Sequence, residues 1–230
     1  MDFSNKNLWL LFEWRGTAVY VTQSMLAAWI VSGALILFAL IVRLRVSSFK
    51  TVPGKAQNVI EALVETMASF TKTTMGEGFE GFGAWFFGIF AFILLSNYAG
   101  LAKLRPPTSD LAVTFALGLT TFLAIHITGI RKRRLGYLKS FIEPNPVFLP
   151  INLIAEISQP ISLGFRLFGN MLGSVVIVNL VYYMLPWFLR LVLPDILHAY
   201  FDIFAGGLQA FIFTVLSMTF IQQKAAGIGK

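Results

Sequence analysis

The sequence contains no cysteine, only two histidines and few charged residues. The missing cysteine excludes disulfide bonds, thiol catalysis and thiolate metal sites, and the His-Glu-x-x-His pattern of metalloproteases is absent. Only 13% of the 230 residues are charged, against about 25% in soluble domains, and 57% are hydrophobic. This composition indicates a protein that crosses a membrane several times, and we expect neither a metal site nor a cofactor.

The net charge of +7 comes from basic residues that flank apolar segments. Charges in such positions orient membrane helices, so we expect no binding to nucleic acid. The first residues lack a basic region followed by a small-residue cleavage site, and we therefore expect no cleaved signal peptide.

The order of the apolar segments predicts an all-α polytopic membrane protein with one membrane domain over residues 1–230. Five helices are expected within the membrane, at residues 18–42, 82–102, 111–130, 147–185 and 195–222. A further helix at residues 56–74 has apolar side chains on one face: Val59, Ile60, Leu63, Val64, Met67 and Phe70. That pattern predicts an amphipathic helix on the cytoplasmic surface of the membrane.

Five crossings place the two chain ends on opposite sides, and the distribution of Lys and Arg selects the orientation. With the C-terminus inside, twelve basic residues face the cytoplasm: Arg43, Arg45, Lys50, Lys55, Lys72, Arg131, Lys132, Arg133, Arg134, Lys139, Lys224 and Lys230. Five face the outside: Lys6, Arg15, Lys103, Arg105 and Arg190. The positive-inside rule thus predicts an outer N-terminus and a cytoplasmic C-terminus.

One arginine, Arg166, lies in the middle of the fourth apolar segment. An arginine at the centre of a membrane helix costs about 2.5–3.5 kcal/mol on insertion scales, so it needs a partner or a function. At helical spacing it shares one narrow stripe with Ser162, Gly169, Asn170 and Gly173, and the glycines let another helix approach closely. No acidic residue lies within one turn, so a distant helix or another chain supplies the partner. A simple ion pair inside the bundle is the alternative.

A second polar stripe follows the last apolar segment, where Asp195, His198, Asp202, Gly206 and Gln209 recur at helical spacing. It predicts a hydrated path for a cation, running from the outer end toward the middle of the membrane. For Asp195 and His198, exposure at the interface near a helix start is the alternative.

Glu156 is a second acid at partial depth, near the inner end of the arginine segment. Two acidic paths from opposite sides, with a fixed positive charge between them, would pass a cation without a continuous leak. Asp110 lies at the outer mouth of the third segment, where capping of the helix is the alternative role. His126 stands in an otherwise apolar helix, and we expect a hydrogen-bonded core residue there rather than a ligand.

The motifs around these residues resemble those of subunit a of the F-type ATP synthase. They are Arg166-Leu167-Phe168-Gly169-Asn170-Met171, Pro150-Ile151-Asn152-Leu153-Ile154 with Glu156, Leu208-Gln209-Ala210-Phe211-Ile212-Phe213, Val52-Pro53-Gly54-Lys55 and Pro107-Thr108-Ser109-Asp110. Together they cover nearly the whole chain, and as a set they are highly specific.

The resemblance implies that Arg166 faces the essential carboxylate of a rotating c-ring, with Asn170 and Gln209 beside it. The half-channel residues that it implies are Glu156 on the cytoplasmic side and Asp110 and Asp202 on the outer side. It also implies a non-catalytic subunit of the bacterial inner membrane, whose last two helices form a long, tilted hairpin. The implied partners are the c-ring, the peripheral stalk of subunit b, the soluble ATP synthase head and the lipid bilayer.

Two positions depart from the pattern of many bacterial members. Val175 stands where they have Glu nine residues after the arginine, and Asp202 stands where they have His seven residues before the glutamine. A single acid on the last helix would then replace a pair of Glu and His. The coupling ion, proton or sodium, stays open.

Two other functions fit part of the pattern. An intramembrane aspartic protease needs two carboxylates that share a proton, gives Arg166 no role, and carries a Gly-x-Gly-Asp motif that this sequence lacks. A secondary transporter would suit the polar stripes, but no internal repeat is visible. Copurification with a ring of small hairpin subunits would separate the transporter from the rotary subunit.

Overall fold

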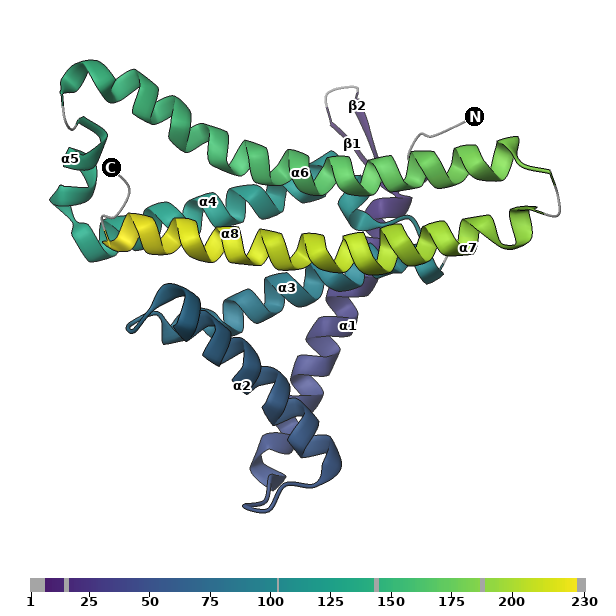
Figure 1. Ribbon diagram of the computed structural model, residues 1–230, viewed down its shortest axis with the longest axis horizontal. Helices are drawn as coiled ribbons and strands as arrows, with labels where there is room; N and C mark the ends of the chain where they lie inside the picture. Colours follow the sequence, from purple (N-terminus) through teal and green to yellow (C-terminus); the bar gives the residue numbers. More distant parts are fainter. Residues whose placement is uncertain (1–6, 15–16, 103, 143–144, 187–188, 227–230) are drawn as a thin grey trace.

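Two long antiparallel helical elements form the main body of the protein. The computed structural model describes residues 7–14, 17–102, 104–142, 145–186 and 189–226. In it α6 (Leu149–Met184) lies beside a second element, which consists of α7 (Leu193–His198), a π-helix (Ala199–Ala205) and α8 (Gly206–Ala226) (Figure 1). α6 ends at Met184, and the following Leu185 has the extended backbone that suits the residue before a proline.

The other elements precede this hairpin in the chain. They are β1 (Asn7–Trp14), β2 (Thr17–Thr22), α1 (Gln23–Arg45), α2 (Lys55–Met75), α3 (Gly83–Tyr98), α4 (Leu111–Arg133) and α5 (Leu135–Ile142). Short 3-10 turns cover Val46–Ser48, Glu80–Phe82, Ala99–Ala102, Pro107–Ser109, Pro146–Phe148 and Leu189–Leu191. Within the described residues, five helical segments are long and apolar enough to cross a membrane, which confirms the predicted all-α polytopic class.

The N-terminal part of the prediction was wrong in one respect. The first helix begins at Gln23 rather than at residue 18, because residues 17–22 pair with β1 in an antiparallel hairpin. Both strands are rich in aromatic and branched side chains, which favour extended backbone. Thr22 then caps the helix, since its hydroxyl accepts a hydrogen bond from the backbone N–H of Met25.

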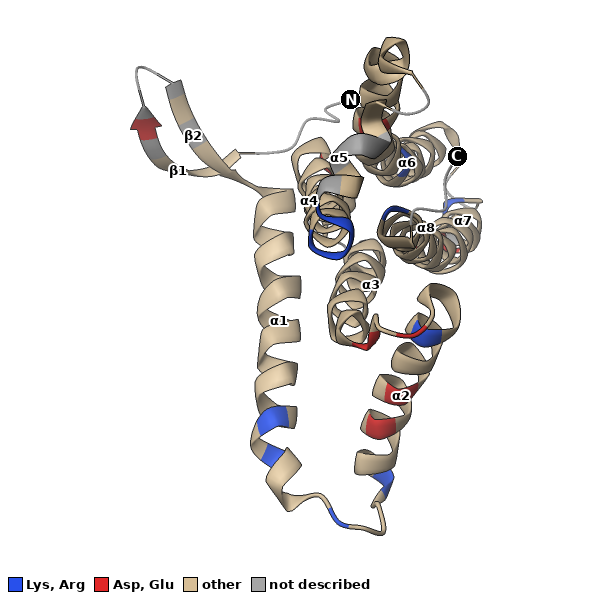
Figure 2. Ribbon diagram, turned by 90° about the vertical axis from the view of Figure 1, so that its left-hand side faces the viewer, with Lys and Arg blue, Asp and Glu red and all other residues tan. Residues whose placement is uncertain are grey.

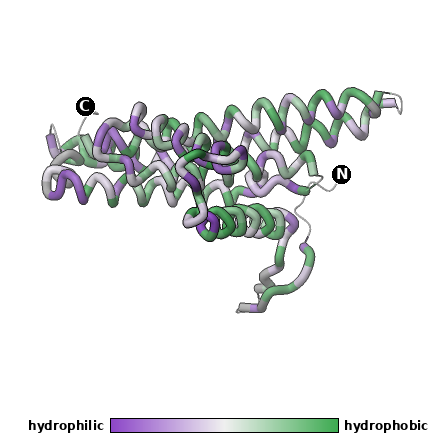
Figure 3. The backbone as a smooth tube through the Cα atoms, turned by 90° about the horizontal axis from the view of Figure 1, so that it is seen from below, coloured by the Kyte–Doolittle hydropathy of each residue, from purple (hydrophilic) through white to green (hydrophobic). Residues whose placement is uncertain are grey.

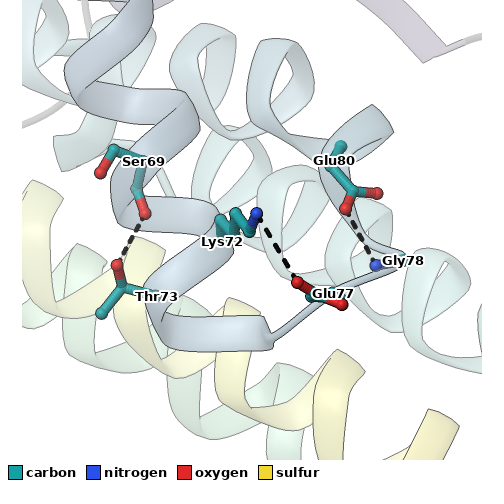
Figure 4. A network of polar contacts seen from close by, with 6 residues as sticks. All are labelled: Ser69, Lys72, Thr73, Glu77, Gly78 and Glu80. Atoms are coloured by element: carbon teal, nitrogen blue, oxygen red, sulfur yellow. Dashed lines mark hydrogen bonds and ion pairs between the residues drawn. The ribbon is translucent and has the colours of Figure 1, made fainter.

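α2 is largely exposed in the chain and ends in a glycine-containing loop. Gly76 and Gly78 both have φ of 84°, a left-handed conformation that suits glycine. Around this loop Lys72 lies 3.8 Å from the Glu77 carboxylate, and the Gly78 N–H donates to Glu80 (Figure 4). With α1 and α3, α2 also lines an apolar groove of about 960 Å³.

The core lies between α3, α6 and α8. Its fully buried side chains include Ile93 from α3, Leu167 from α6, and Ala210 and Phe213 from α8. These apolar residues face one another, and so they fix which side of α6 points inward and which side points away.

α4 packs against α6 through glycines. A Cβ atom on Gly118 would lie only 2.7 Å from the carbonyl oxygen of Pro160, and one on Gly164 would lie 3.4 Å from the carbonyl oxygen of Thr114. The absence of side chains at these positions therefore allows the two backbones to approach closely.

α3, α4, α6 and α8 run roughly along one direction, and α1 runs across it (Figure 2). Basic residues concentrate at the last turns of α1 and α4 (Figure 2). Hydrophobic residues dominate the long helices, whereas hydrophilic residues gather at the hairpin end near the C-terminus (Figure 3).

Four of the basic residues that were assigned to a side of the membrane lie outside the described residues: Lys6, Arg15, Lys103 and Lys230.

Replacement of Gly118 by Ala should destabilise the packing of α4 on α6. The new methyl group meets a backbone oxygen that cannot move aside, and overpacking of this kind costs about 1–3 kcal/mol. The thermal denaturation midpoint of the assembled complex in detergent measures the effect. Gly88→Ala is the matched control, because a Cβ there meets nothing within 4 Å. Equal midpoints for the two variants would contradict the prediction.

Candidate ion-translocation site

The two faces of α6 differ in what they contact. One face is buried against the bundle, through Leu163, Leu167, Met171, Ser174 and Val178. The other carries the predicted stripe, in which Ser162, Arg166 and Gly169 are exposed and Asn170 and Gly173 are half-buried. A Cβ on either Gly169 or Gly173 would meet nothing within 4 Å. The stripe therefore faces away from the rest of the chain.

Arg166 has no hydrogen-bond or ion-pair partner among the residues that the structure describes. Within the described residues, the ion pair that the sequence left as an alternative is thus not formed. An exposed guanidinium halfway along an apolar helix is costly in lipid unless an opposite charge from outside the chain meets it.

Asp202 is the best buried acid of the last element, with 3% of its surface exposed. His198 lies one turn before it, with Nδ1 2.7 Å from Asp202 Oδ2, and the Ser174 hydroxyl of α6 donates to Oδ1 at 3.4 Å. Both side chains belong to the stripe predicted from the sequence. The carboxylate of Asp202 and the imidazole of His198 therefore form a pair within one helical element.

The helix around Asp202 is a π-helix, a feature that the sequence analysis missed. π-Helical turns are rare and occur frequently at functional sites. The 3-10 turn Ala99–Ala102, which follows α3, approaches this π-helix closely, since a Cβ on Gly100 would lie 2.7 Å from Asp202 Oδ2. No simple spacing rule for an α-helix would have revealed this geometry.

A second polar network lies next to Asp202. The side-chain amide of Asn97 donates to the Gly206 carbonyl at 2.8 Å, and Thr108 donates its hydroxyl to Asn97 Oδ1 at 2.6 Å. Asn97 and Thr108 are fully buried. Neither was predicted, although a lone Asn in the apolar α3 is itself a signal of an intramembrane polar role.

Asp110 acts as the helix cap that the sequence left as its alternative role. Its carboxylate accepts a hydrogen bond from the Ala112 N–H at 3.0 Å, and the Ser24 hydroxyl donates to its other oxygen at 2.6 Å. The start of α4 is thereby joined to the start of α1. Asp195 is exposed near the start of α7, which agrees with the interfacial alternative for that residue.

Glu156 is buried at the other end of the hairpin, where Lys224 of α8 forms an ion pair with one of its oxygens. The second oxygen, Oε2, is buried and has no hydrogen-bond partner in the described part of the chain. Gln209, near the start of α8, is also buried, and its Nε2 has no hydrogen-bond partner among the described residues. The sequence analysis counted Lys224 only among the basic residues that face the cytoplasm.

The expectation of a hydrogen-bonded His126 was wrong. Its ring packs between Phe122, at 3.9 Å, and Tyr137, at 6.0 Å between ring centroids, while Nδ1 is buried without a hydrogen-bond partner among the described residues. Aromatic contacts therefore hold this imidazole in place. No group of three or more His, Asp or Glu side chains that could hold a metal ion occurs in the described ranges.

The apolar spans define a polytopic helical membrane protein, and ionisable groups inside such a bundle are typical of ion pathways. The chain matches the family model of the ATP synthase A chain over residues 25–222, and it belongs to that family. It is accordingly a membrane-sector, ion-channel subunit of the ATP synthase, and its role is non-catalytic. The family implies assembly with a c-ring and a stalk.

Replacement of Gly100 by Ala should impair ion transport by displacing Asp202. The new Cβ would lie 2.7 Å from Oδ2, the oxygen that contacts His198, so the carboxylate has to shift from its present position. We expect ATP-driven ion uptake by the reconstituted complex to fall several-fold. Gly88→Ala, on the open face of α3, should transport normally. Unchanged uptake in the Gly100 variant would show that the close contact is dispensable.

Proposed function

We propose that Arg166 separates two offset half-channels and meets the carboxylate of a rotating c-ring. The observation that carries the proposal is the exposed guanidinium on the outward face of α6, without a partner in the described residues. Gly169 and Gly173 beside it leave open space, which supports close passage of another helix. Asn170 and Gln209 are proposed to flank the arginine.

The outer half-channel is proposed to run past Asp110, Asp195, His198 and Asp202. Support comes from the pairing of His198 with the buried Asp202 and from the Ser174 hydroxyl beside them. Buried polar groups of this kind can pass a cation between them, since each offers oxygen or imidazole nitrogen to it.

The inner half-channel is proposed to begin at Glu156. This acid is buried at the opposite end of the hairpin from Asp202, and one of its oxygens is unpartnered. Ser162 lies between it and Arg166 on α6, and it is proposed as a further polar group of this path. The two paths then reach the ring from opposite sides of the membrane and never join.

The electrostatics of Arg166 would couple ion flow to rotation. A ring carboxylate that approaches the arginine is favoured in its ionised form, so it releases its cation into one half-channel. The fixed positive charge repels a cation that would pass directly from one path to the other. Net flow therefore requires the ring to turn, which links ion transport to ATP synthesis or hydrolysis in the head.

We propose that the subunit lies in a bacterial inner membrane, with the N-terminus outside and the C-terminus in the cytoplasm. The starts of α1 and α4 are joined through Ser24 and Asp110, which supports placing both on the outer side. The basic last turns of α1 and α4 support a cytoplasmic location for the other ends. The proposed partners are the c-ring, a peripheral stalk of subunit b and, through the stalks, the soluble head.

Replacement of Arg166 by Ala should abolish ATP synthesis and ATP-driven ion uptake in reconstituted complexes. The separating charge is lost, while α6 keeps its buried face, so the subunits should still assemble. Subunit composition after purification checks assembly. Arg45→Ala is the control, because Arg45 is exposed in the last turn of α1, far along the chain from the stripe. An Arg166 variant that synthesises ATP at the full rate would overturn the mechanism.

The coupling ion is proposed to be the proton, with sodium as the alternative, and ATP-driven uptake into proteoliposomes distinguishes them. For a proton-coupled complex, a protonophore should collapse all transport, and sodium should have no effect. For a sodium-coupled complex, sodium uptake should persist and rise with the protonophore, because the opposing membrane potential is then dissipated. In that case Asp202 and His198 would line a sodium path.

A further inference from the structure

The ion pair between Glu156 and Lys224 joins the two ends of the long hairpin. Glu156 lies in the first turns of α6, and Lys224 lies in the last turn of α8. The acid is almost fully buried, with 7% of its side chain exposed, whereas 26% of the lysine side chain is exposed. The carboxylate is therefore fixed inside the protein, and its cationic partner reaches it from the rim.

α5 covers this pair from one side. Tyr137 of α5 is buried against Gly129 of α4, where even a Cβ atom would lie 2.6 Å from the ring. Burial, together with the nearby negative charge of Glu156, raises the pKa of the Tyr137 phenol to about 12. The phenol thus stays neutral at physiological pH, and it adds no second negative charge beside Glu156.

The ammonium group of Lys224 also lies near an aromatic ring. Its Nζ lies 5.8 Å from the centroid of the Phe141 ring of α5, at the outer limit of a cation–π contact. α5 is held to α6 by the Asn152 side-chain amide, which donates to the Phe141 carbonyl at 2.8 Å. Lys224 accordingly has a defined position beside Glu156, between two elements that are anchored independently of it.

The carboxylate keeps one free binding position. Lys224 contacts Oε1, whereas Oε2 is buried and has no hydrogen-bond partner in the described part of the chain. An unpaired buried carboxylate oxygen is expensive, so the site is suited to receive a cation or a water molecule. A second cation at Oε2 would, however, be repelled by the ammonium group while that group stays in place.

We propose that Lys224 is an internal competitor for the coupling ion at the entrance of the inner half-channel. The ion binds Glu156 only as the ammonium group moves away into water, and the lysine returns when the ion has passed toward the ring. A lysine suits this exchange, because it carries a compact, strongly hydrated charge on a flexible stem. This inference rests on the proposed inner half-channel, and it makes Lys224 a residue that sets the ion affinity of that path.

The test is ATP-driven ion uptake by the whole complex in proteoliposomes with the soluble head facing the medium. In this arrangement the medium supplies the inner half-channel, and the lumen, kept at constant composition, receives the ion from the outer one. Uptake is measured against the concentration of the coupling ion in the medium. For a proton-coupled complex this is the pH of the medium.

Lys224→Gln should lower the ion concentration for half-maximal uptake roughly tenfold, about one pH unit for protons. The positive charge of Lys224 weakens the affinity of the Glu156 carboxylate for a cation by at least about that factor, and the substitution removes it. Lys224→Arg should raise it, since the guanidinium fork binds a carboxylate more firmly. A lysine that merely tethers α8 to α6 would leave the half-maximal concentration unchanged in both variants. Lys72→Gln, at an exposed ion pair, is the matched control for loss of one positive charge.

Glu156→Gln separates failure of this inference from failure of the proposed function. If uptake falls in Glu156→Gln but the Lys224→Gln curve coincides with the wild type, the competitor role is wrong and the inner half-channel stands. If Glu156→Gln transports normally, the half-channel assignment and the competitor role both fail. Subunit composition and ATP hydrolysis rates of each variant verify that the complexes are intact before the curves are compared.

Discussion

An arginine whose charge is energetically unfavourable in lipid is the constraint on which this structure depends. Arg166 sits halfway along an apolar helix, with the core on one side and an open face on the other. An arginine at the centre of a membrane helix costs about 2.5–3.5 kcal/mol on insertion scales, and no ion pair with a described residue offsets this cost. Membership in the ATP synthase A chain family implies that the chain assembles with a c-ring and a stalk.

The two buried acids, Asp202 and Glu156, differ from Arg166 in the partners that they have within the chain. Asp202 has His198 beside it, and Glu156 has Lys224, so each negative charge already has a basic neighbour inside the chain. The 3-10 turn Ala99–Ala102 approaches the π-helix closely at Gly100, and Asp202 is buried between these packed elements. Each buried acid therefore has a basic partner inside the chain, whereas Arg166 has no ion-pair partner among the described residues.

Much of the fold followed from periodicity and hydropathy, because a membrane helix has to satisfy its backbone within itself and bury about twenty apolar residues in sequence. The hairpin of β1 and β2 did not follow, since residues 18–22 are apolar enough to extend α1 and only strand pairing decides against a helix. The π-helix also escaped prediction. Its hydrogen bonds close one residue later than those of an α-helix, and the apolar periodicity of the segment does not indicate this change.

By itself, the sequence determined which residues had to be explained: Arg166 in an apolar helix, the acids Glu156 and Asp202 at partial depth, and the glycines beside them. It did so because a charge in a long apolar segment is unfavourable whatever the fold. Only the tertiary structure decided how each charge is met. Lys224 lies 68 residues from Glu156, and Asn97 lies 109 residues from Gly206, so these contacts depend on helix packing. Helical spacing relates residues a few positions apart, whereas the partners of buried charges are chosen by whichever helices the core brings together.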